Sequence, residues 1–142
     1  MKYLTDSENQ TIQLGKKIAT KLKGGEVIGL VGNLGAGKTT LIKGIAKGLG
    51  IKKPITSPTF VLMKVYPTKG KIKKLIHIDC YRVKSAKEIE AIGATEYFGQ
   101  KDTVIVIEWA EKIKSILSRQ KIEINIKLID KDEREIIIKK YG

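Results

Sequence analysis

Cysteine is nearly absent from this sequence, since Cys80 is the only one in 142 residues. A single thiol excludes an intrachain disulfide and a zinc site built from several cysteines. Long apolar runs are absent too, because no stretch reaches the roughly 18 uninterrupted apolar residues of a transmembrane helix. The N-terminal segment MKYLTDSENQ is polar where a secretory signal would be apolar. We therefore expect a cytoplasmic protein without a membrane segment.

Arginine and acidic residues are scarce beside lysine. The arginines are Arg82, Arg119 and Arg134, and 28 Lys and Arg against 15 Asp and Glu give a net charge of +13. Such a charge attracts polyanions, and nucleic acid is the commonest partner of strongly basic proteins. Lysines scattered along a whole chain are equally typical of a heat-adapted, solvated surface. The composition leaves both interpretations open.

No repeat, low-complexity tract or linker divides the chain, so we expect one domain spanning residues 1–142. Apolar periodicity predicts helices where it follows a helical turn, and strands where apolar residues run together or alternate. Thr5 and Ser7 are candidate N-caps of the first helix. The predicted helices cover residues 6–23, 38–50, 85–92 and 110–117, and the predicted strands cover residues 26–32, 59–66, 72–79, 102–109, 121–129 and 134–141. The last two strands form a predicted antiparallel hairpin at the sheet edge, and the strands before and after the lysine-rich turn 67–71 form another antiparallel pair.

Residues 32–39, GNLGAGKT, fit the pattern G-x-x-x-x-G-K-[ST] without a mismatch, between a predicted strand and a predicted helix. Glycines let the backbone turn its N–H groups around a phosphate, and the helix N-terminus adds its positive dipole end. Lys38 can reach the β- and γ-phosphates, and the Thr39 hydroxyl can coordinate magnesium. The predicted nucleotide contacts of this segment are Asn33, Leu34, Gly35, Ala36, Gly37, Lys38, Thr39 and Thr40.

Two acids close predicted apolar strands. Asp79 ends LIHID and Glu108 ends VIVIE. Ligands of open α/β sheets bind at the carboxyl ends of the strands, so both acids are expected beside the phosphate loop. Either acid alone could equally be a helix cap or part of a solvated turn. The two acids together with the loop indicate a site that holds magnesium and orients water.

Five segments occur in the order and approximate spacing of the TsaE (YjeE) family: GNLGAGKTT, SPTF, HIDCYR, IGATEYF and VIEW. From about the first helix to Trp109 the chain resembles that family. With the elements above, the resemblance implies an α/β, P-loop NTPase-like three-layer fold: a mixed β-sheet with parallel core strands and an antiparallel C-terminal edge hairpin. It further implies a magnesium-dependent ATPase, weak alone and stimulated by a TsaB–TsaD heterodimer. Such a protein is required for making threonylcarbamoyladenosine beside the anticodon of tRNAs that read codons beginning with A.

Carried onto this sequence, the resemblance assigns roles to individual residues. Lys38 and the loop backbone would bind ATP, while Thr39 and Glu108 would hold Mg²⁺. Asp79 would contact the metal or a nucleotide-bound water, and Glu8 would lie near the base. Lys38, Asp79 and Glu108 are therefore the predicted catalytic residues. We expect a monomer, and the sequence leaves open whether it contacts tRNA directly or only through its partners.

Several residues remain open at this stage. Thr59 in SPTF would lie on a switch segment near the γ-phosphate, or it simply begins a strand. Trp109 would stack on the base or a partner, or it belongs to the core, and His77 is interpreted as structural. Asn33 replaces the acid that the family most often has in this position, which we expect to matter little because the backbone faces the phosphate.

The main alternative function is that of a small-molecule P-loop kinase, and two further alternatives are a GTPase and a basic RNA-binding module that uses nucleotide only as a structural ligand. Such kinases usually neutralise the transferred phosphate with an arginine-rich lid, and none of the three arginines lies in a recognisable lid segment. The same scarcity predicts slow hydrolysis by the isolated chain, because no arginine finger is evident.

Overall fold

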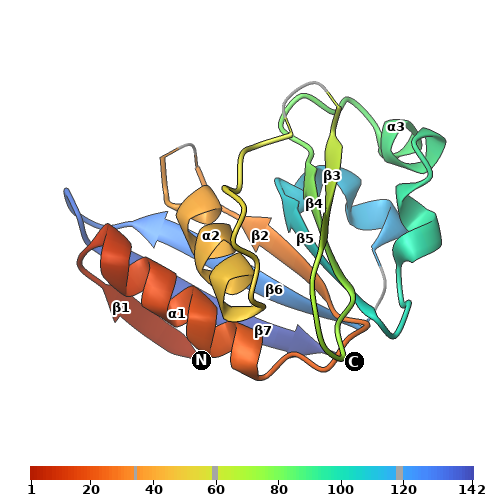
Figure 1. Ribbon diagram of the computed structural model, residues 1–142. Helices are drawn as coiled ribbons and strands as arrows, with labels where there is room; N and C mark the ends of the chain where they lie inside the picture. Colours follow the sequence, from red (N-terminus) through yellow and green to blue (C-terminus); the bar gives the residue numbers. More distant parts are fainter. Residues whose placement is uncertain (34, 59–60, 118–119) are drawn as a thin grey trace.

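The computed structural model describes residues 1–33, 35–58, 61–117 and 120–142. Its described strands form one seven-stranded sheet in the order β1-β7-β6-β2-β5-β4-β3 (Figure 1). The strands are β1 (Lys2–Thr5), β2 (Val27–Val31), β3 (Met63–Pro67), β4 (Lys74–Asp79), β5 (Thr103–Glu108), β6 (Lys121–Leu128) and β7 (Arg134–Tyr141). The helices are α1 (Glu8–Thr20), α2 (Lys38–Gly48) and α3 (Ala86–Ala91), with the 3₁₀ helices η1 (Ala94–Tyr97) and η2 (Ala110–Ile116).

Parallel strands form the centre of the sheet. Strand β2 pairs in parallel with β5 on one side and with β6 on the other, and β5 pairs in parallel with β4. The pairs β3–β4 and β6–β7 are antiparallel, as the sequence predicted. The predicted mixed sheet with parallel core strands is therefore confirmed.

Strand β1 was not predicted, and it changes the position of the C-terminal hairpin. It pairs antiparallel with β7 in the register Lys2↔Ile137 and Tyr3↔Ile136. The hairpin is present as expected, but the outermost strand on that side is β1 rather than β7. A four-residue strand whose partner lies at the far end of the chain carries little local signal.

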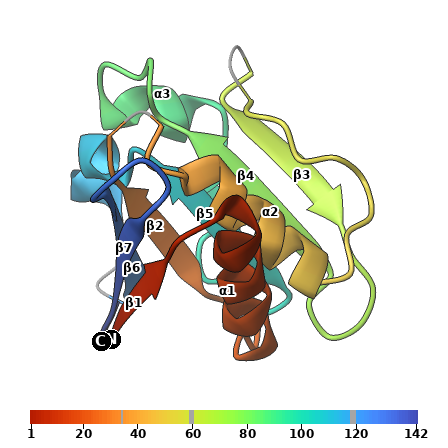
Figure 2. The same cartoon turned by 90° about the vertical axis from the view of Figure 1, so that its left-hand side faces the viewer.

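Alternate residues of the central strands supply two separate cores. On β5, Val104 and Val106 pack into the cluster under α1 and α2, while Ile105 and Ile107 pack into the cluster under α3, η1 and η2. Figures 1 and 2 show α1 and α2 on one face of the sheet and the other three helices on the opposite face. This arrangement confirms the three-layer α/β architecture. It also explains the continuous apolar runs, because β5 is buried on both faces.

Helices α1 and α2 approach each other closely through glycine. A Cβ atom added at Gly44 would lie 2.3 Å from the Ile12 carbonyl oxygen, and one added at Gly15 would lie 2.6 Å from the Leu41 carbonyl oxygen. Ser7, one of the two candidate caps, begins α1 by accepting a hydrogen bond from the Gln10 N–H at 3.1 Å. Helix α1 thus supports α2, whose first residue is Lys38.

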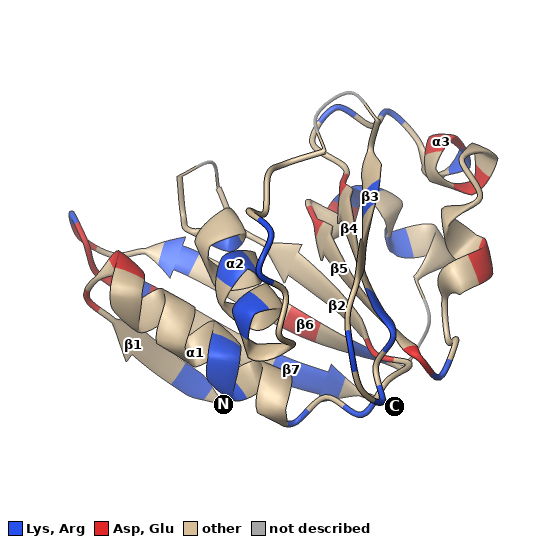
Figure 3. Ribbon diagram, in the orientation of Figure 1, with Lys and Arg blue, Asp and Glu red and all other residues tan. Residues whose placement is uncertain are grey.

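Basic residues are spread over both long helices, the outer strands and the turns rather than gathered on a single element (Figure 3). Within the described segments, no helix has both the length and the apolar character needed to cross a membrane.

Candidate nucleotide site

A cavity of about 290 Å³ lies where β2, β4 and β5 end and α2 begins. Of the residues predicted to form a site, Asn33, residues 35–40, Asp79 and Glu108 line it. Ser57, Tyr81, Trp109 and Arg134 complete the lining. Glu8 is not part of this lining and is exposed at the start of α1. Leu34, a predicted nucleotide contact, and Thr59, whose role the sequence left open, lie outside the described residues.

The glycines of the loop adopt conformations and close contacts that a side chain would prevent. Gly37 has φ 103° and Gly35 has φ 78°, which are left-handed conformations that favour glycine, and a Cβ atom on Gly35 would meet nothing within 4 Å. A Cβ atom on Gly32 would lie 2.5 Å from the Ile126 carbonyl oxygen, so this glycine lets the loop leave β2 against β6. The loop backbone thus has the glycine-dependent turns that a phosphate cradle requires, and phosphate binding by this loop stays a prediction.

Lys38 is held inside this loop. Its Nζ donates to the carbonyl oxygens of Gly32 and Asn33, the latter at 3.2 Å, and lies 4.0 Å from the centre of the Trp109 ring. Burial lowers the pKa of Lys38, while the negative charge of Glu108 opposes the shift. Carbonyl oxygens and a ring face therefore hold the Lys38 ammonium at the cavity, with the negative charge of Glu108 nearby.

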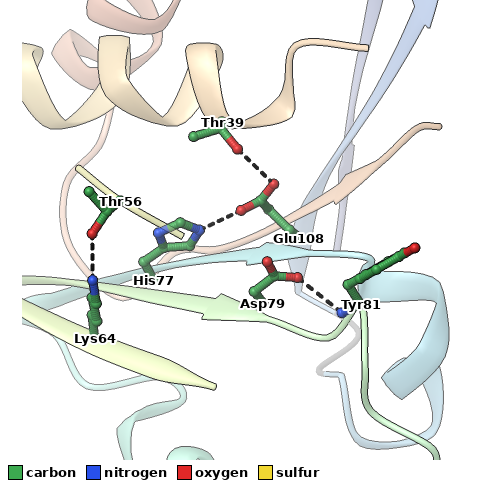
Figure 4. Close-up of polar contacts among 7 residues, drawn as sticks. All are labelled: Thr39, Thr56, Lys64, His77, Asp79, Tyr81 and Glu108. Atoms are coloured by element: carbon green, nitrogen blue, oxygen red, sulfur yellow. Dashed lines mark hydrogen bonds and ion pairs between the residues drawn. The ribbon is translucent and has the colours of Figure 1, made fainter. Parts of the chain in front are cut away.

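Glu108 is fixed at both carboxylate oxygens (Figure 4). Oε1 accepts a hydrogen bond from the Thr39 hydroxyl at 3.1 Å, and Oε2 lies 2.7 Å from His77 Nε2. Since a carboxylate only accepts, Nε2 carries the proton in this contact. His77 is completely buried, and its Nδ1 has no partner among the described residues.

The contact between His77 and Glu108 adds a role that the sequence interpretation missed. His77 is buried, as a structural residue should be, but its hydrogen bond also orients a predicted metal ligand. One signal was available, because His77 lies two residues before Asp79 on β4 and side chains two apart on a strand share a face.

Asp79 lies beside Glu108, because the two residues are partners in the parallel pairing of β4 and β5. Its Oδ1 accepts a hydrogen bond from the Tyr81 N–H at 3.0 Å. Burial raises the pKa of Asp79, and the negative charge of Glu108 acts in the same direction. The predicted strand-end acids therefore meet at one edge of the sheet.

Thr39 and Glu108 offer the oxygen ligands that magnesium prefers. In the part of the chain that the structure describes, no group of three or more His, Cys, Asp or Glu side chains could hold a metal by itself. A magnesium ion would therefore need phosphate oxygens and water to complete its octahedral shell. This donor set fits a metal that binds together with a nucleotide.

Trp109 and Arg134 also line the cavity. Trp109 has φ 59°, a rare left-handed conformation for a bulky residue, and its ring centre lies 5.2 Å from that of Tyr81. It also packs against the core under η2, so it belongs to both the core and the cavity wall. Arg134, which the sequence interpretation left without a role, donates from Nε to the Ala36 carbonyl oxygen at 3.0 Å. No local sequence signal marks that contact.

Comparison with known proteins identifies a matching family. The family model described as "Threonylcarbamoyl adenosine biosynthesis protein TsaE" matches residues 5–136. A relative named tRNA threonylcarbamoyladenosine biosynthesis protein TsaE, from Bacillus subtilis, is 41% identical over 143 residues, covering 100% of this chain and 87% of that protein. Proteins of the same name from Aquifex aeolicus and Treponema pallidum are 41% and 39% identical, covering 95% and 97% of this chain and 92% and 99% of theirs.

The fold has a counterpart among solved structures. The crystal structure of Bacillus subtilis YdiB superimposes with a TM-score of 0.80 and 36% sequence identity, covering 100% of this chain and 86% of that chain. The similarity therefore includes the sheet, both helical layers and the segments that form the cavity.

Proposed function

This chain belongs to the TsaE family of threonylcarbamoyladenosine biosynthesis proteins, and on that premise we propose that it is a magnesium-dependent ATPase that works with a TsaB–TsaD-like heterodimer. The observation that supports this proposal is the convergence of the phosphate loop, Lys38, Thr39, Asp79 and Glu108 on one cavity. Lys38, Thr39, Asp79 and Glu108 lie at the ends of strands or at the start of a helix, so rigid elements hold these four side chains.

Different residues of the site would bind the phosphates, the metal ion and a water molecule. Backbone N–H groups of the loop and the Lys38 ammonium would bind the phosphates. Thr39 and Glu108 would hold Mg²⁺, which when bound neutralises negative charge on the phosphate oxygens. Asp79 faces the same cavity and can hold a water molecule by accepting a hydrogen bond from it.

The proposal is tested by steady-state ATP turnover with the chain alone, with tRNA, with a TsaB–TsaD pair, and with both. We expect slow turnover alone and a clear increase with the protein pair, because the partner would supply groups that this site lacks. Lys38→Ala should abolish turnover and leave the fold intact, as measured by circular dichroism. Lys47→Ala is the matched control, because it removes an exposed lysine from the same helix.

The outcomes separate the candidate functions. Unchanged turnover in Lys38→Ala would contradict the proposed site. Transfer of the γ-phosphate to a small acceptor, without release of inorganic phosphate, would show a kinase instead.

A further inference from the structure

Arg134 connects the C-terminal hairpin to the phosphate loop across 98 residues of sequence. It is the first residue of β7, directly after the turn 129–133. Its Nε donates to the Ala36 carbonyl oxygen at 3.0 Å, and its Nη1 donates to the Asp132 carbonyl oxygen at 3.1 Å. One guanidinium therefore holds the turn and the loop together.

Gly37 makes room for this guanidinium. A Cβ atom added at Gly37 would lie 2.7 Å from Arg134 Nε and 3.0 Å from its Cδ. Gly37 therefore has two reasons to be glycine: its left-handed φ of 103° and the side chain packed against its Cα. The arginine lies directly against the residue that precedes Lys38.

The position of the hydrogen bond determines the direction of one amide. The Ala36 carbonyl and the Gly37 N–H belong to the same planar trans peptide, so they point in opposite directions. Arg134 draws the carbonyl towards itself, which turns the Gly37 N–H the other way. A hydrogen bond from a charged donor is roughly twice as strong as a neutral one, so it can hold this orientation before a ligand arrives.

We propose that Arg134 is a positioning residue of the nucleotide site: it presets the Ala36–Gly37 peptide for phosphate binding and couples the turn 129–133 to nucleotide occupancy. This inference rests on the proposed nucleotide-binding function. Fixing the peptide in advance removes part of the ordering cost of binding, so the affinity for phosphate ligands depends on the arginine. Because Arg134 also holds the Asp132 carbonyl, a ligand that orders the loop orders the turn as well.

The first test measures the Kd of ATP, ADP and inorganic triphosphate by calorimetry in the presence of Mg²⁺. Arg134→Ala should raise all three Kd values about tenfold, because the loss concerns the phosphate cradle and not the base. Arg134→Lys keeps the charge and one reachable donor, and it should recover most of the affinity. Lys131→Ala is the matched control, since it removes one exposed positive charge from the same turn and should change each Kd less than twofold.

The second test measures amide hydrogen exchange with and without ATP and Mg²⁺. In the unmodified protein, the nucleotide should slow exchange at Gly37 and also in the turn, where the Ile129 N–H donates to the Glu133 carbonyl at 2.9 Å. In Arg134→Ala at saturating ATP, protection should persist in the loop and disappear from the turn. A residue that only stabilised the fold would change exchange across the turn without making it depend on nucleotide.

The two proposals fail in different ways. Absence of ATP binding by the unmodified protein would contradict the proposed function. Normal binding by the unmodified protein, with an equal Kd in Arg134→Ala, would overturn the role of Arg134 alone. Equal weakening in Arg134→Ala and Lys131→Ala would also overturn it, because general charge would then explain the effect.

Discussion

Glu108 illustrates how a single carboxylate is prepared for its role. It is 4% exposed, so an ionised side chain here needs partners. Thr39 occupies one oxygen and His77 the other, which fixes the plane of the carboxylate before any ion binds. Thr39 would itself bind the ion, whereas His77 lies behind the carboxylate. Replacing His77 therefore tests how much the orientation of the Glu108 carboxylate contributes to metal binding.

Replacing His77 with leucine should raise the Mg²⁺ concentration needed for half-maximal nucleotide binding by about 10- to 100-fold, the usual effect of losing a partner behind a metal ligand. His77→Gln keeps a donor at a similar reach and should recover part of the loss. The measurement is a Mg²⁺ titration of fluorescent-nucleotide binding, with thermal unfolding recorded for each variant. An unchanged Mg²⁺ requirement in His77→Leu would show that Thr39 alone orients the carboxylate.

Asp79 should show a conflict between stability and activity. Burial raises its pKa above the ordinary value of 3.8, so the folded state binds the proton more tightly than the unfolded chain. The free energy of unfolding therefore decreases as pH rises from 3.8 through the raised pKa. Asp79→Asn keeps an acceptor for the Tyr81 N–H but carries no charge, so it should be more stable than the unmodified protein at neutral pH.

The same variant should lower ATP turnover by at least about tenfold, because the amide is a much weaker base for holding and activating water. Urea unfolding over a series of pH values and steady-state turnover measure the two effects. The stability difference should shrink as pH falls, when both side chains become neutral. An Asp79→Asn protein that is less stable at neutral pH would contradict this account of the carboxylate.

The helices and strands that have a clear local sequence pattern were predicted correctly. The β-branched runs of β2 and β5 indicated buried strands, and the loop before Lys38 indicated the helix that follows. Lys38 and Thr39 could be proposed from sequence because they belong to the motif, and Asp79 and Glu108 because they end the apolar runs of β4 and β5. Their convergence needed only the rule that parallel strands end at the same edge.

Contacts between segments that are far apart in the sequence could not be predicted from local pattern, because they depend on which strands pair and in which register. Strand β1 exists because Lys2–Thr5 finds β7, and nothing in those four residues specifies that partner. Arg134 reaches Ala36 only because the hairpin packs beside the loop, and the same turn in another register would aim the side chain elsewhere.

The crossing of α1 and α2 is a second case in which distant segments control the site. Gly44→Ala would gain helix propensity of about 1 kcal/mol. The new methyl group would lie 2.3 Å from the Ile12 carbonyl oxygen, and overpacking of this kind costs about 1–3 kcal/mol. The steric cost should exceed the gain in helix propensity, because the methyl group would meet backbone atoms, and this contact cannot relax by rotating a side chain.

We therefore expect Gly44→Ala to lower the free energy of unfolding by up to about 2 kcal/mol and to weaken nucleotide binding, since α2 begins at the phosphate loop. Urea denaturation and nucleotide titration test this expectation. Lys47→Ala, on the exposed side of the same helix, should leave both quantities nearly unchanged. Equal or higher stability of Gly44→Ala would mean that the helices separate without penalty.

For the molecule as a whole, Cys80 can report how the core opens. The thiol is completely buried, in the cluster beneath α3 and η2, and its backbone N–H donates to the Glu108 carbonyl at 3.0 Å. Burial raises the pKa of the Cys80 thiol to about 12, so the reactive thiolate is rare in the folded state at neutral pH. Alkylation of the native protein therefore requires an opening that exposes this core.

Because the residue lies next to Asp79, that opening should also disrupt the nucleotide site. A ligand that binds only the closed state slows alkylation by a factor of 1 + [L]/Kd, so ATP with Mg²⁺ at 100 times its Kd should slow the reaction about 100-fold. The rate is measured by mass spectrometry after timed exposure to iodoacetamide. Lys38→Ala should show no such slowing. An alkylation rate that does not depend on nucleotide in the unmodified protein would contradict this expectation. It would mean that a local movement of α3 and η2 exposes Cys80 and leaves the phosphate loop intact. The two faces of the sheet would then open independently.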